Sequence, residues 1–164
     1  MNSLAKYRIE SMKSFRTDDG MAYSGKLICD GKQVATFVDH GDGGGTNVDF
    51  AVRAEELQFI DDIAGAGFDG VEPVAMAIAR LADATETLKR VKKDFRKFIC
   101  FVRPDHKPSE YGTVKITSRD QVFLDRACEY ISTKYPEAVI INNESEDVLW
   151  ARVLSWYDGV TEVA

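Results

Sequence analysis

The first 52 residues alternate apolar and polar side chains between turn residues, a pattern typical of antiparallel β-strands. Asp30-Gly31 separates two of these runs, and an Asp-Gly pair favours the tight turn of a β-hairpin. The pattern predicts a β-meander, with strands at residues 6–15, 21–29, 32–40 and 46–52.

Beyond residue 52 the apolar spacing becomes helical. Leu57, Ile60 and Ile63 mark a short helix, and a longer one begins near Pro73. The remaining elements are predicted as strands at 98–102, 112–117 and 138–142 and helices at 119–134 and from 146 onward. We expect the first two of these strands to pair and Ser118 to cap the helix at 119–134, with inward residues Val122, Ala127, Tyr130 and Ile131. We therefore expect an α+β fold, with an N-terminal antiparallel β-meander, then helices and a short second β segment, and with helices packed on one face of the sheet. Because no linker-like segment interrupts the 164 residues, we expect a single domain over 1–164.

The composition, with 45% hydrophobic and 29% charged residues, is that of a globular protein. The sequence shows neither a signal peptide nor an apolar run of bilayer-spanning length, which predicts a cytoplasmic protein that does not bind membranes. Cys29, Cys100 and Cys128 are widely spaced and odd in number, so we expect buried free thiols instead of disulfides or a zinc site.

Residues 65–70 match the GxGxxG fingerprint of dinucleotide sites, but a helical pattern precedes them, and Pro73 would fall inside the helix that the fingerprint requires. We interpret the segment as a loop between helices.

A second glycine-rich segment follows the third predicted strand. Consecutive glycines allow backbone N–H groups to converge on an anion and allow close approach by a partner. A plain strand connection and a ligand- or partner-binding loop are both open interpretations. The binding candidates here are Asp39, His40, Gly41, Asp42, Gly43, Gly44, Gly45, Thr46 and Asn47. Because neither His40 nor His106 has an evident nucleophile or ligand set, we predict no catalytic residues, cofactor or metal.

The net charge of −6 is unevenly distributed. Residues 89–97 carry six basic side chains against Asp94, a local charge of +5 that leaves −11 for the rest. This run is either a solvated helix face or a contact surface for phosphates or an acidic protein. Its binding candidates are Lys89, Arg90, Lys92, Lys93, Arg96 and Lys97.

The last predicted helix, 146–159, is apolar over much of its circumference. Leu149, Val153, Trp156 and Val160 form one stripe, and Trp150, Leu154 and Tyr157 form a second. Such a helix is either buried in the core or meets another chain, in a homodimer or with a partner. Trp150, Trp156 and Tyr157 are the candidate contacts.

Two stretches, YSGKLICDGKQVATFVDHGDGGGTNVDF and KFICFVR…YGTVKI…ISTKYPEAVIINNE, resemble a group of short hypothetical proteins of phage, plasmid and bacterial genomes that has no assigned activity. The shared features are a strand-DGK-strand segment, a Gly-Gly loop, a Lys-rich strand and a closing Tyr…Ile-x-Asn segment. The loop at Asp39–Gly45 departs from the group in being more acidic and richer in glycine. The resemblance implies a mobile-element setting and no particular chemistry.

These observations favour a non-enzymatic interaction protein, an inhibitor or modulator of a host or defence complex that a phage or mobile element encodes. One alternative is an enzyme or sensor that binds a nucleotide or metal at the glycine loop. The other is a nucleic-acid binder that uses the basic segment 89–97.

Overall fold

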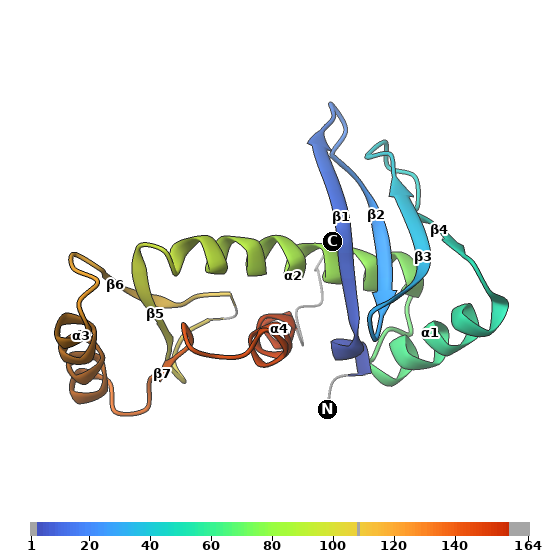
Figure 1. The fold of residues 1–164 in the computed structure, drawn as a ribbon. Helices are drawn as coiled ribbons and strands as arrows, with labels where there is room; N and C mark the ends of the chain where they lie inside the picture. The colour runs from blue at the N-terminus through green and yellow to red at the C-terminus, as the bar shows by residue number, and fades with distance from the viewer. Residues whose placement is uncertain (1–2, 108, 158–164) are drawn as a thin grey trace. The chain divides into compact units, whose positions relative to one another are not determined.

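The computed structural model describes residues 3–107 and 109–157 (Figure 1). The chain divides into two compact units, Met1–Thr85 and Glu86–Ala164, and the division falls within one long helix. The assignment of a single domain over 1–164 stays a prediction. The fold class is α+β as predicted, with a four-stranded antiparallel sheet followed by helices and a three-stranded sheet.

The N-terminal unit contains the predicted β-meander. Its elements are η1 (Ser3–Lys6), β1 (Tyr7–Arg16), β2 (Met21–Cys29), β3 (Lys32–Asp39), β4 (Asn47–Phe50), α1 (Arg53–Gly65) and the first part of α2 (Pro73–Asp94). The strands pair antiparallel in the order β1-β2-β3-β4. Asp30 and Gly31 have φ angles of +48° and +80°, the two positive values of the tight hairpin turn that Asp-Gly predicts.

One face of this sheet is buried beneath α1. The ring of Phe59 on α1 lies 4.9 Å from that of Tyr7 on β1 and 5.7 Å from that of Phe50 on β4. The helix that Leu57, Ile60 and Ile63 predict is present, but Leu57 and Ile60 are 52% and 39% exposed, while Phe59 is fully buried. The aromatic ring buries more apolar surface than either aliphatic side chain, and its contacts set the rotation of the helix.

The C-terminal unit contains the rest of α2, then β5 (Phe98–Val102), β6 (Gly112–Lys115), α3 (Gln121–Lys134), β7 (Val139–Ile140) and α4 (Glu146–Ser155). Its antiparallel strands have the order β6-β5-β7, which confirms the predicted pairing of 98–102 with 112–117. Ile99 and Phe101 of β5 form a buried cluster with Ala127 and Ile131 of α3.

Two details of α3 differ from the sequence-based prediction. The helix is capped by Asp120, whose carboxylate accepts a hydrogen bond from the Phe123 backbone N–H at 2.8 Å, and not by Ser118. Val122 and Tyr130, predicted to point inward, are 60% and 51% exposed. Ala127 and Ile131, which were also predicted to face inward, are buried and belong to the cluster with β5.

Both sheets place a glycine opposite a phenylalanine. Gly25 of β2 pairs with Phe37 of β3, and Gly112 of β6 pairs with Phe101 of β5. A Cβ at Gly25 would lie 2.8 Å from the Phe37 ring, and one at Gly112 would overlap the Phe101 ring. In each sheet the absent side chain makes room for an aromatic ring of the core.

Two further predictions concern the whole chain. All three cysteines are free, as predicted, but only Cys100 is buried, while Cys29 and Cys128 are half-buried. No helix in residues 3–107 or 109–157 is long and apolar enough to cross a membrane.

Candidate functional site

The glycine loop joins β3 to β4 and lies beside the loop of the β1–β2 hairpin, at the same end of the sheet (Figure 1). The Thr17 hydroxyl of the hairpin loop donates a hydrogen bond to the Gly41 carbonyl at 2.7 Å. The same hydroxyl accepts from the Gly20 backbone N–H at 3.0 Å, so it connects the two loops. We call these two loops, residues 15–21 and 40–46, the tip.

Gly41 fits the tip because it has no side chain. Its φ of +64° lies in the left-handed region, and a Cβ there would lie 2.6 Å from the Ala22 backbone nitrogen and 2.8 Å from the Met21 carbonyl carbon. The sequence therefore places glycine where the β3–β4 loop packs directly on the backbone of β2. Gly43 also has positive φ, +80°, but nothing lies within 4 Å of its Cβ position.

Side chains of the loop satisfy its own backbone. The Asp39 carboxylate accepts hydrogen bonds from the Gly41 N–H at 2.8 Å and from the Thr46 hydroxyl at 2.7 Å. The Asp42 carboxylate accepts from the Gly44 N–H at 3.0 Å. Two of the N–H groups that an anion would need are therefore already bonded to carboxylates, and the loop is better suited to present negative charge than to cradle a phosphate.

Tyr23 of β2 contacts the base of the glycine loop. Its hydroxyl lies 3.1 Å from the Thr46 hydroxyl, and burial is the main cause that raises the pKa of Tyr23 above its ordinary value. Asn47, the last of the predicted loop candidates, is exposed and begins β4 opposite Val38. The structure thus brings Asp39, Thr46 and Tyr23 into one hydrogen-bonded group at the base of the loop.

Exposed apolar and acidic side chains surround the tip. Phe15 pairs with Ala22 and Met21 pairs with Arg16, so the two apolar side chains lie on opposite faces of the hairpin. Phe15 is 64% exposed and Met21 is 55% exposed. Asp18 and Asp19 of the hairpin loop and Asp42 of the glycine loop are also exposed. We call these five residues the tip surface. His40 is exposed beside them, and among the described residues no group of three His, Cys, Asp or Glu side chains could hold a metal ion.

The basic segment does not form one continuous helix face. Helix α2 ends at Asp94, three residues before the end of the run. Lys89 pairs with Glu86 at 2.8 Å, and Lys92 pairs with Glu146 at 2.9 Å. Arg90, Lys93, Arg96 and Lys97 are exposed. Neighbouring acids therefore neutralise part of the predicted binding surface.

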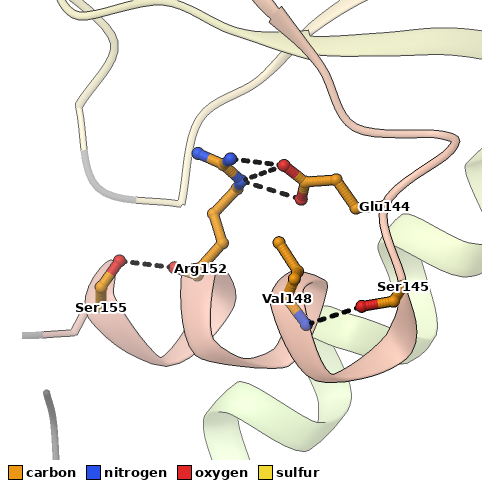
Figure 2. Close-up of polar contacts among 5 residues, drawn as sticks. All are labelled: Glu144, Ser145, Val148, Arg152 and Ser155. Atoms are coloured by element: carbon orange, nitrogen blue, oxygen red, sulfur yellow. Dashed lines mark hydrogen bonds and ion pairs between the residues drawn. The ribbon is translucent and has the colours of Figure 1, made fainter.

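Helix α4 is capped and held at its start by polar contacts (Figure 2). The Ser145 hydroxyl accepts from the Val148 N–H at 3.4 Å, and the Arg152 Nε donates to both oxygens of Glu144, at 3.1 and 2.9 Å. The helix is observed over Glu146–Ser155, so Val160 of the predicted stripe lies outside the described residues.

The aromatic candidates of α4 make contacts within the chain. Trp150 is 1% exposed. The Trp156 ring stacks on that of Tyr111 with centroids 6.2 Å apart, and the Tyr157 hydroxyl lies 2.7 Å from that of Thr87. Hydrogen bonding to Asp94 adds to burial in raising the pKa of Tyr111 to about 12. These contacts agree with the interpretation of α4 as a core helix.

Sequence reasoning identified the glycine loop but missed Phe15 and Met21, because alternating strand residues give no sign of which ends stay uncovered. Comparisons of the chain with models of protein families, with curated proteins and with solved structures found no match.

Proposed function

We propose that this chain is a non-enzymatic interaction protein that acts in the cytoplasm and binds a partner protein through the tip surface. The observation that carries the proposal is the exposure of two large apolar side chains, Phe15 and Met21, on the two faces of the hairpin end whose loop carries Asp18 and Asp19. Large exposed apolar side chains with a polar surround are typical of protein contacts. Exposed carboxylates around them would favour a basic surface on the partner.

The rigidity of the tip supports a recognition role. The Thr17–Gly41 hydrogen bond and the packing of Gly41 on the backbone of β2 fix the two loops against each other. A loop that is ordered before binding loses less conformational entropy in the complex. Gly41 therefore serves a defined loop geometry.

Charge supports the same partner chemistry. Residues 1–85 contain eight basic and fourteen acidic side chains, a net charge of −6, whereas residues 86–164 contain thirteen of each. The entire net charge of the chain thus lies in the unit that carries the tip. A basic partner would associate faster with this unit at low ionic strength.

The proposed partner is a host or defence complex, and the chain would inhibit or modulate it by covering a basic functional surface. This setting follows from the resemblance to proteins of phage and plasmid genomes. Occlusion of this kind requires surface complementarity and no catalytic group.

The test is affinity isolation from bacterial host lysate with the wild-type chain and two variants. The tip variant carries Phe15→Ser, Asp18→Lys and Asp19→Lys. The control variant carries the same kinds of change elsewhere, at exposed positions of α1 and the following loop: Leu57→Ser, Asp61→Lys and Asp69→Lys. Both variants change the net charge equally.

The proposal predicts that a stoichiometric partner remains bound to the wild type and the control variant and is lost with the tip variant. Equal retention by all three proteins would refute the assignment of the tip. A wild-type chain that captures no partner and turns over a small molecule would refute the interaction role.

A further inference from the structure

Several exposed basic residues of the C-terminal unit, Arg90, Arg126 and Lys134 among them, form no ion pair within the described residues, and five others lie around the end of α2. These five are Lys93, Arg96, Lys97, Lys115 and Arg119. Within residues 3–107 and 109–157, none of the five forms an ion pair with a carboxylate. Lys89 and Lys92 of the same basic segment, by contrast, pair with Glu86 and Glu146. Five uncompensated positive charges therefore lie around the end of α2.

Three elements bring these residues together. The Ile116 N–H donates a hydrogen bond to the Lys97 carbonyl at 2.8 Å, which places the end of β6 beside the start of β5. The Arg119 guanidinium donates to the Arg96 carbonyl at 3.2 Å, which places the residue before the α3 cap beside the end of α2. Lys115 and Arg119 thereby join a basic group that is distant from them in sequence.

An open surface cavity of about 420 Å³ lies within this group. Its apolar lining consists of half-buried Phe95, Ile116 and Leu124, and its basic lining consists of Arg96 and Arg119. The site thus combines an apolar surface with two guanidinium groups that are able to pair with anions or stack on planar groups.

Two carboxylates lie near this cavity in sequence, and both accept hydrogen bonds. Asp94 accepts from the Tyr111 hydroxyl at 2.7 Å. Asp120 accepts from the Phe123 N–H as the cap of α3 and from the Ser118 hydroxyl. Neither Asp94 nor Asp120 forms an ion pair with any of the five basic side chains.

We propose that this site binds single-stranded nucleic acid. An unstacked base would pack against Phe95 and the guanidinium planes, while adjoining phosphates pair with the surrounding lysines. A duplex fits less well, because its bases are stacked and paired and do not enter a cavity. An acidic peptide would match the charge, but its aspartate and glutamate side chains have no aromatic ring to stack on Phe95. The site belongs to the C-terminal unit, so the inference does not depend on the proposed function of the tip.

The first test measures binding of a fluorescein-labelled ten-nucleotide oligo(dT) and oligo(U) by fluorescence anisotropy. Arg96→Glu and Arg119→Glu should each weaken binding at least about tenfold. Lys89→Glu makes the same charge change at a residue already in an ion pair, and it should change the affinity less than about twofold. The logarithm of the affinity should fall with the logarithm of salt concentration with a slope of about −2 if three phosphates are neutralised.

The second test uses the unmodified protein and an oligonucleotide of equal length and charge whose central bases are removed. The proposal predicts at least about fivefold weaker binding, because the cavity loses its base. Equal binding of the abasic strand or of a duplex would overturn the base-binding cavity. Tighter binding of a poly-glutamate peptide than of both oligonucleotides would replace nucleic acid with an acidic protein as the ligand, and absence of oligonucleotide binding at low salt would overturn the site altogether.

Discussion

Gly41→Ala is the change that most directly tests the structure of the tip. Its φ of +64° costs a residue with a Cβ about 1–2 kcal/mol. The new Cβ would also lie 2.6 Å from the Ala22 nitrogen and 2.8 Å from the Met21 carbonyl carbon. These are backbone atoms of a paired strand, so the clash is relieved only by moving the loop, at a further cost of about 1–3 kcal/mol.

Gly43→Ala is the matched control. Gly43 lies in the same loop and has a φ of +80°, but nothing lies within 4 Å of its Cβ position. Gly43→Ala should therefore lower the free energy of unfolding by the conformational cost alone, about 1–2 kcal/mol. Gly41→Ala should exceed it by about 1–3 kcal/mol in the free energy of unfolding.

The assay is urea denaturation of both variants, with hydrogen exchange to locate the change. Gly41→Ala should increase exchange at residues 17–23 and 39–46, because the two loops separate, and partner capture should weaken. If Gly43→Ala destabilises the protein as much as Gly41→Ala does, the close approach of the loop to β2 is refuted.

Three further predictions concern packing and charge. Gly112→Ala should lower the free energy of unfolding by about 1–3 kcal/mol, because the methyl group overlaps a buried ring, and unchanged urea denaturation would contradict this packing. Burial opposes ionisation of Asp62, but hydrogen bonds from Lys6 and Tyr7 outweigh the effect of burial and lower the pKa of the Asp62 carboxyl group. The stability that the ionised Asp62 contributes is present above its ordinary pKa of 3.8 and is lost as the pH falls through the lower pKa of the folded state. When urea denaturation is measured across that pH range, the free energy of unfolding should therefore fall less for Asp62→Asn than for the wild type. Glu144→Ala should cost about 1–3 kcal/mol because it removes a mostly buried acceptor of three hydrogen bonds from Arg152. Glu146→Ala, at an exposed ion pair, should cost under about 1 kcal/mol, and equal effects in urea denaturation would contradict the difference.

The strands of the meander follow from local sequence. Side-chain alternation gave β2 its observed bounds, 21–29, and Asp30-Gly31 supplied the two positive φ angles that the hairpin requires. Both signals act between residues that are close in the chain, so the sequence alone contains them.

The rotation of the helices depends on distant contacts. Phe59 faces the sheet because Tyr7 and Phe50 receive its ring, and neither residue lies within its helix. Periodicity therefore indicated that α1 exists but did not identify Phe59 as a residue that packs on the sheet. An amphipathic pattern with several apolar positions does not decide which of them packs.

The candidate sites show the same limit. The run of glycines marked the β3–β4 loop, but its exposed neighbours Phe15 and Met21 come from another hairpin. The basic segment was visible in the sequence, whereas Lys115 and Arg119 join it through the pairing of β5 with β6 and a hydrogen bond to Arg96. Sites assembled from separate segments require the tertiary structure.

The most direct test of the proposed interaction role is the native mass of the chain isolated from the host cytoplasm at low salt. The proposal predicts a complex heavier than the 18.3 kDa chain, which the control variant retains and which the tip variant and high salt reduce to 18.3 kDa. A wild-type mass of 18.3 kDa, or a complex that survives the tip substitutions unchanged, would contradict it.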